Sequence, residues 1–219
     1  MWMSELPPFV PFFLAALLAL LTRGPLRAAL MLAAPLLGGL HLWFDVPDGT
    51  LLSVSLLEFE LTLMRADRLS LLFGYIFHIA AFILVIYTLH LRDTMQHVAG
   101  LVYAGSALGA VFAGDLITLL IAWHLVGVLL YLLLGHDTRS RSAYRYGFWT
   151  FFTYRIGDLP LVLAAALLYQ AYGTWSLPEI FAFTREWFDE WGVGEAHRFA
   201  IDLAVEEIFT NMVKYNAGG

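Results

Sequence analysis

Four ionisable residues stand inside stretches of sequence that are otherwise apolar: His78, His124, Arg155 and Asp158. Ionisable groups are costly at membrane depth, so their presence there usually serves a function. Histidine titrates near neutral pH and can take up and release a proton. We therefore predict a proton path in which His124, Asp158 and Arg155 take part, with His78 as a weaker candidate.

Arg155 and Asp158 are three positions apart, which places them on one face of a helix and lets them form an ion pair. If one member of this ion pair moves away from the other, the pair would act as an electrostatic gate. A simpler interpretation is that the pair only neutralises itself inside a bundle, and that each histidine only satisfies hydrogen bonds. A third alternative is haem ligation, since His78 and His124 are expected at similar depth. We rank it below the proton path and expect no cofactor, because no flavin, quinone or iron–sulfur motif is visible.

The composition indicates that these residues lie in a membrane protein. Hydrophobic residues make up 60% of the chain and charged residues 14%, and the mean hydropathy is +0.74. Lipid is the natural solvent for so apolar a chain. The sequence contains no cysteine, which excludes disulfides, thiol catalysis and cysteine-ligated metal sites. The net charge of −6 argues against nucleic acid as a partner.

Apolar stretches of roughly the length needed to cross a bilayer, about 20 residues, predict an all-α membrane bundle of about six transmembrane helices. The expected spans are 8–21, 28–43, 69–91, 94–114, 116–134 and 148–171. Between the second and third spans, residues 57–63 alternate apolar and polar side chains, which predicts a strand in a short external β-hairpin-like loop.

Arginine placement predicts the orientation of the bundle. Arginines gather in the loops after the first, third and fifth spans, so these loops are expected on the cytoplasmic side. The N-terminus and the chain after residue 171 are then expected outside. Residues 184–219 are acidic with apolar residues at helical spacing, which predicts a C-terminal amphipathic helix.

Several motifs between residues 67 and 181 resemble the antiporter-like membrane subunits of respiratory complex I and of Mrp-type cation/proton antiporters. They are Asp67–Phe73, Gly114–Leu120, Ala122–Gly127, Tyr154–Asp158 and Gly173–Thr174, and they are most like the large complex I subunit. The resemblance implies that residues 1–181 are the N-terminal part of such a membrane domain. It also implies transport of protons or Na⁺, and other membrane subunits as partners. The expected location is a bacterial inner membrane, with both ends periplasmic. The chain would at most be a non-catalytic subunit of an NADH:quinone oxidoreductase-like complex.

One departure from this family affects the predicted path. His124 stands where the family carries a glutamate directly after the tryptophan of its fifth helix, and that glutamate is central to the proposed proton transfer. Histidine keeps a titratable group but reverses the sign of its charged form. The family's seventh-helix lysine and second repeat are also not matched here, so we expect the path to depend on partners.

The segment from Trp187 to Gly219 resembles the opening of a GHKL-type ATPase domain of the anti-sigma-factor kinase kind. Leu203–Asn211 is similar to its N box, which implies that Glu207 would polarise the attacking water and Asn211 would bind Mg²⁺. Two further hypotheses follow: a membrane-anchored, ATP-binding signalling protein, and a non-functional fusion remnant. The leading hypothesis remains an ion-translocating subunit.

Overall fold

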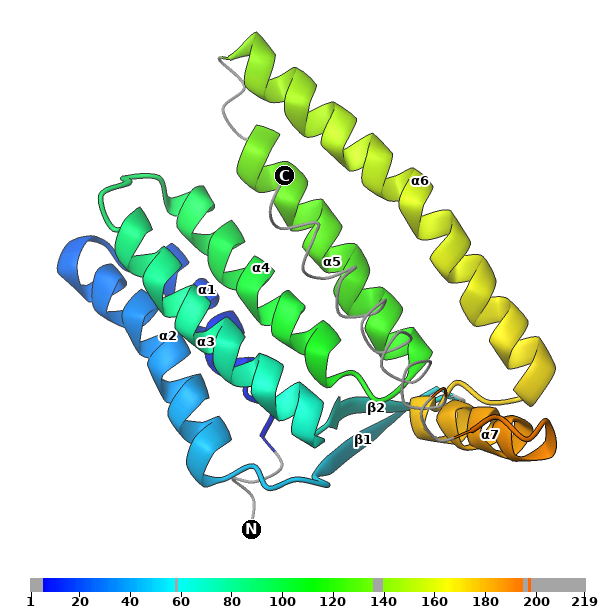
Figure 1. Ribbon diagram of the computed structural model, residues 1–219. Helices are drawn as coiled ribbons and strands as arrows, with labels where there is room; N and C mark the ends of the chain where they lie inside the picture. The colour runs from blue at the N-terminus through cyan, green and yellow to red at the C-terminus, as the bar shows by residue number, and fades with distance from the viewer. Residues whose placement is uncertain (1–5, 58, 136–139, 195–196, 198–219) are drawn as a thin grey trace.

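The computed structural model describes residues 6–57, 59–135, 140–194 and 197. Six helices lie side by side as a bundle, and a two-stranded sheet and a seventh helix lie at one end of it (Figure 1). In chain order the elements are α1 (Val10–Leu21), α2 (Gly24–Phe44), β1 (Leu51–Leu56), β2 (Phe59–Arg65), α3 (Arg68–Thr88), α4 (Thr94–Phe112), α5 (Leu116–Gly135), α6 (Arg141–Tyr172) and α7 (Leu177–Glu190). The predicted helical membrane architecture is thus present.

The predicted number of spans is not confirmed. Within the described residues, five helices are long and apolar enough to cross a membrane, namely α2 to α6. Helix α1 has 12 residues. A helix of that length rises about 18 Å, whereas the hydrocarbon core is about 30 Å thick. Its ends explain the shortness, because Pro7 and Pro8 precede it and Thr22 at its end adopts an extended backbone.

Helix α1 nevertheless belongs to the core of the bundle, where it packs on α2 and α4. Its inward face carries Phe12, Ala15, Ala16 and Ala19, all of which are buried. Small residues let helices approach closely, which is how membrane helices gain packing contacts. The main apolar cluster is built around this face and the facing sides of α2, α3 and α4.

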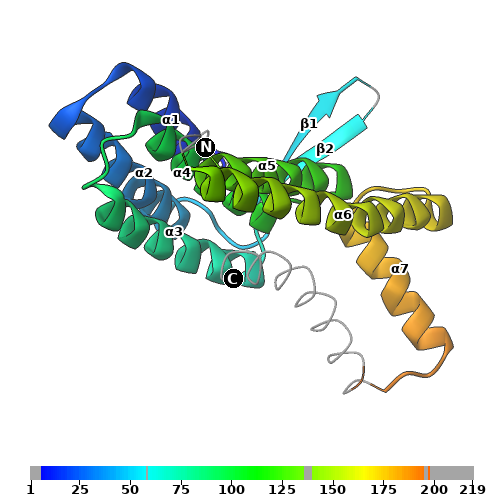
Figure 2. The same ribbon diagram turned by 90° about the horizontal axis from the view of Figure 1, so that it is seen from above.

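Helix α6 lies at the edge of the bundle and packs along α5 (Figures 1 and 2). It is 32 residues long, and the residues buried along it are Gly147, Asp158 and Ala165. Most of its remaining surface is apolar and faces outward. A single buried carboxylate therefore stands out at the α5–α6 contact.

The strands β1 and β2 pair antiparallel, which confirms a hairpin between α2 and α3. The strand β2 begins two residues later than the predicted stretch 57–63. Leu57 lies in the turn with φ of 57°, and β2 starts at Phe59. A short run of alternating apolar and polar side chains indicates a strand but does not locate its first residue. The geometry of the turn determines where strand pairing begins.

Asp115, in the turn between α4 and α5, joins this hairpin to the bundle. Its buried carboxylate accepts hydrogen bonds from the Thr62 N–H at 2.6 Å, the Thr118 N–H at 2.8 Å and the Thr118 hydroxyl at 2.6 Å. The neighbouring Gly114 donates its N–H to the Thr62 carbonyl at 2.9 Å. A side chain at Gly114 would collide with Thr62, since its Cβ would lie 2.3 Å from Thr62 Cγ2.

The same turn also holds the connection from α6 to α7. The Leu116 N–H donates to the Trp175 carbonyl at 2.9 Å, and the Leu177 N–H donates to the Gly114 carbonyl at 3.0 Å. Helix α7 follows this connection and lies across the end of α5 and α6 (Figure 1). It is an amphipathic helix that starts before the predicted segment 184–219. Most of that segment, including Glu207 and Asn211, lies outside the described residues.

Candidate functional site

Asp158 on α6 is the centre of the candidate site, because three side chains converge on its buried carboxylate. Its Oδ1 accepts a hydrogen bond from Trp123 Nε1 at 2.7 Å. Its Oδ2 lies 2.9 Å from Arg155 Nη2 and 3.7 Å from His124 Nε2. Asp158 is only 4% exposed. The two helices therefore meet at a cluster of one acid, one base and one titratable ring.

Helical geometry explains how this cluster forms. Arg155 and Asp158 are separated by about one turn of α6, so the structure brings them together as their spacing predicted. Trp123 and His124 are adjacent on α5, and both face α6 because α5 and α6 pack closely along their lengths. The sequence spacing on α6 therefore accounts for the Arg155–Asp158 pair. The packing of α5 on α6 adds Trp123 and His124 to the cluster.

The two oxygens of Asp158 have different surroundings. Oδ1 receives a well-formed hydrogen bond from the buried indole of Trp123. Oδ2 is buried beside Arg155 but accepts no well-aligned hydrogen bond within the described structure. A buried carboxylate oxygen without a full set of donors is energetically costly. Oδ2 is therefore the oxygen that is free to respond to a change in its neighbours.

The hydrogen bond of His124 to its own helix fixes how the ring faces this oxygen. Nδ1 lies 2.7 Å from the carbonyl of Leu120, and a carbonyl only accepts, so Nδ1 carries a proton. In the neutral ring Nε2 is then an unprotonated acceptor that points toward Asp158 Oδ2, which is also an acceptor. Protonation of Nε2 converts this unfavourable contact into an ion pair.

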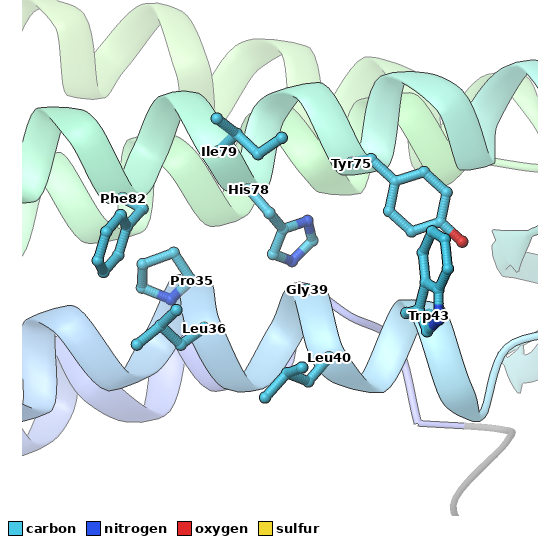
Figure 3. Close-up of a pocket in the computed structure, with 9 residues that line it drawn as sticks. All are labelled: Pro35, Leu36, Gly39, Leu40, Trp43, Tyr75, His78, Ile79 and Phe82. Carbon is cyan, nitrogen blue, oxygen red and sulfur yellow. The ribbon is translucent and has the colours of Figure 1, made fainter.

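His78 lies elsewhere in the bundle. Its Nδ1 is 2.6 Å from the Gly74 carbonyl and its Nε2 is 3.4 Å from the Pro8 carbonyl, so it is bound to α3 itself and to the segment before α1. Figure 3 shows its ring pointing toward α2 at Gly39, in a groove lined by apolar side chains. The structure does not bring His78 into the cluster around Asp158.

This placement contradicts the haem alternative. Ligation by two histidines requires rings that face each other across one helix interface. His78 packs against α1 and α2, while His124 faces α6. Similar depth along the sequence did not reveal that the rings point into different interfaces, because depth says nothing about rotation around the helix axis.

Trp123 is the site residue that sequence reasoning missed. No role was assigned to it from the sequence, yet its side chain is only 6% exposed and its indole N–H donates a hydrogen bond to Asp158. A buried tryptophan N–H usually needs an acceptor. Its position next to a titratable residue in an apolar span was the available signal.

Comparisons with known proteins relate this geometry to a known class of membrane subunits. Residues 113–204 match the family described as NADH:quinone oxidoreductase/Mrp antiporter, TM. Over 77 residues the chain is 62% identical to the probable inorganic carbon transporter subunit DabB1 of Halothiobacillus neapolitanus, covering 35% of this chain and 14% of that protein. Over 116 residues it is 34% identical to NAD(P)H-quinone oxidoreductase chain 5 of a Picosynechococcus species, covering 49% of this chain and 17% of that protein.

A solved structure shows the same fold. A chain of the membrane-bound sulfane sulfur reductase, an archaeal respiratory membrane complex, superposes with a TM-score of 0.71 at 22% identity, over 83% of this chain and 30% of that chain. The present chain thus spans less than a third of the length of each of these relatives. The family match reaches residue 204 and so overlaps the beginning of the segment that resembles an ATPase opening. The chain is homologous to antiporter-like membrane subunits over part of their length.

Proposed function

We propose that this homologue of antiporter-like membrane subunits carries protons along a path in which His124, Asp158 and Arg155 form the switch. The observation that supports the proposal is the sharing of one buried oxygen, Asp158 Oδ2, between Arg155 at 2.9 Å and His124 at 3.7 Å. Ionisable groups placed together at membrane depth are the usual components of proton relays.

The switch has two states that differ by one proton. With a neutral ring, His124 presents an acceptor to Asp158, and the carboxylate pairs with Arg155. When His124 gains a proton on Nε2, it competes with Arg155 for the same oxygen. Loss of that proton toward the other side of the membrane restores the first state. The gap of 3.7 Å is longer than a hydrogen bond, so a side-chain movement or a bridging water must close it.

The charges around Asp158 favour H⁺ over Na⁺ as the transported ion. A metal cation needs several oxygen ligands, and Asp158 Oδ2 is the carboxylate oxygen that this cluster offers. The guanidinium of Arg155 is already in contact with that oxygen and would repel a metal ion. A proton needs only one acceptor at each step.

The chain is proposed to act within a larger membrane assembly, because its relatives include subunits of multi-subunit complexes. The 62% identity to a probable inorganic carbon transporter subunit favours an assembly that uses the proton movement to drive inorganic carbon uptake. The 34% identity to a quinone oxidoreductase chain makes a redox-driven assembly the second candidate.

The proton path is tested by flux measurements on the full-length protein with its partner subunits in membrane vesicles. Asp158→Asn and His124→Gln remove the titratable groups but keep side chains of similar size. General acid–base groups contribute about 100- to 10,000-fold to rates, so each variant is expected to lose most of the pH-gradient-driven flux, read with a pH-sensitive dye.

The matched control is Asp48→Asn, which changes a carboxylate in the exposed loop after α2 and is expected to keep full flux. Unchanged flux in both Asp158→Asn and His124→Gln would contradict the proposal. Uptake of labelled bicarbonate by cells that express the same variants separates the two kinds of assembly. Dependence of that uptake on Asp158 favours the inorganic carbon transporter, and independence excludes it.

A further inference from the structure

Gly127 of α5 faces the side chain of Arg155 at very short range. A Cβ atom at Gly127 would lie 2.5 Å from Arg155 Nη2, 3.7 Å from Arg155 Cζ and 3.6 Å from Tyr154 Cδ1. The shortest of these distances is far below any real contact of a Cβ atom. With Arg155 where it is, no residue larger than glycine fits at position 127.

The conformation of the backbone does not explain this glycine. Gly127 lies inside α5 and is absent from the positive-φ residues of the described chain. Alanine is a better helix former than glycine, so helix propensity also argues against glycine here. Space for the neighbouring guanidinium is the remaining physical reason.

Three surfaces border that guanidinium. Nη2 is 2.9 Å from Asp158 Oδ2, and Cζ lies 5.2 Å from the centre of the Phe151 ring. The backbone of α5 at Gly127 forms the third side. The carboxylate and the ring both belong to α6, as Arg155 does, so Gly127 is the bordering surface that comes from the facing helix.

We propose that Gly127 is a positioning residue for the switch: its missing side chain leaves the space that holds the Arg155 guanidinium against Asp158. This inference rests on the proposed function and adds a residue that acts through Arg155 rather than on the proton itself. It also gives α5 control of the ion pair on α6, since any shift of α5 along or around its axis moves the backbone that borders the guanidinium.

The Gly127→Ala variant tests the inference, because the added methyl group must displace Nη2 by most of an ångström. The obstructing atom is the end of a flexible side chain, so the fold is expected to survive. A misplacement of about 1 Å in a reacting group can lower rates by about 100-fold, and we expect a loss of proton flux between about 10- and 100-fold. Gly157→Ala is the matched control, because Gly157 is adjacent to Asp158 on α6 and a Cβ there meets nothing within 4 Å.

A double-mutant cycle distinguishes positioning from general packing. Arg155→Lys keeps the positive charge on a narrower side chain that leaves room for the methyl group. If Gly127 acts through the guanidinium, Gly127→Ala has little further effect in the Arg155→Lys background. An equal loss in both backgrounds, or no loss in either, would overturn the inference.

A structure of the Gly127→Ala protein in its assembly provides a readout that does not depend on flux. The expected result is an Arg155 guanidinium that has moved away from Asp158 Oδ2, with α5 unchanged. An intact Arg155–Asp158 contact in that variant would refute the positioning role. Failure of the proposed function would give a different result. The Asp158→Asn variant would then keep its proton flux, while the structure of Gly127→Ala would still show a displaced Arg155 guanidinium.

Discussion

Trp123 of α5 donates its indole N–H to Oδ1 of Asp158 on α6 over 2.7 Å, and both side chains are buried. This bond holds one oxygen of the carboxylate in place, and the other oxygen consequently faces Arg155 and His124. The orientation of the proposed switch thus depends on a tryptophan that does not itself titrate.

Replacing Trp123 by phenylalanine should destabilise the protein by removing this donor. A buried acceptor that loses its partner costs about 1–3 kcal/mol, so we expect the Trp123→Phe variant to unfold at a lower temperature in lipid nanodiscs. Trp149→Phe is the control, because Trp149 is 56% exposed on α6 and should tolerate the change. Equal melting temperatures for Trp123→Phe and the unaltered protein would contradict the structural role of this bond.

The packing of His78 predicts a difference between two adjacent glycines of α2. A Cβ at Gly38 would lie 2.5 Å from His78 Nε2 and 2.7 Å from the Pro8 carbonyl, whereas a Cβ at Gly39 would lie 3.4 Å from its nearest neighbour. Overpacking typically costs about 1–3 kcal/mol. Thermal unfolding should therefore show a clear loss of stability for Gly38→Ala and little change for Gly39→Ala.

The two alanine variants differ by one position on the same helix, so helix propensity cancels between them. A similar free energy of unfolding for both variants would show that the His78 ring moves aside easily and that the close packing around it does not contribute to stability.

Asp115 is expected to be required for attachment of the hairpin to the bundle. Its carboxylate accepts three hydrogen bonds, from the Thr62 N–H, the Thr118 N–H and the Thr118 hydroxyl. Hydrogen bonds to charged groups contribute about 1.5–3 kcal/mol each, so Asp115→Ala should lower stability by at least about 2 kcal/mol. Hydrogen exchange in β2, at Phe59–Arg65, should accelerate in this variant.

Thr118→Val removes one of those three donors and should give a smaller effect in the same direction. Asp48→Ala, in an exposed loop, serves as the control for loss of a carboxylate. Unchanged exchange in β2 after Asp115→Ala would mean that other contacts hold the hairpin.

The orientation predicted from arginine placement is testable with reporter fusions. The loops that follow α1 and α3 lie at one end of the bundle, as do the last turn of α5 and the first turn of α6, and the hairpin and α7 lie at the other end (Figure 1). We expect a reporter inserted at Arg92 to be cytoplasmic and one inserted in the β1–β2 turn to be periplasmic. The reverse result would contradict the orientation, and a reporter at the N-terminus decides whether the short helix α1 crosses the membrane.

The sequence predicted the individual elements well where periodicity and length are strong. The helical bundle, the hairpin and the one-turn spacing of Arg155 and Asp158 are all visible in the order of residues. The predicted first span, 8–21, corresponds closely to α1, but this helix has 12 residues and is not among the five that are long enough to cross a membrane. Helix α7, Leu177–Glu190, was not predicted as an element of its own, and most of the predicted amphipathic segment 184–219 lies outside the described residues.

The sequence of neighbouring residues therefore determined which segments are apolar enough for a membrane and which residues pair within one helix. Hydropathy and the 3.6-residue helical repeat are both properties of residues close together in the chain. Only the tertiary structure decided that Trp123, Gly127 and His124 of α5 meet Arg155 and Asp158 of α6, and that His78 turns toward α1 and α2 instead. These contacts depend on the rotation of each helix about its axis and on its neighbours, and residues far apart in the sequence set both.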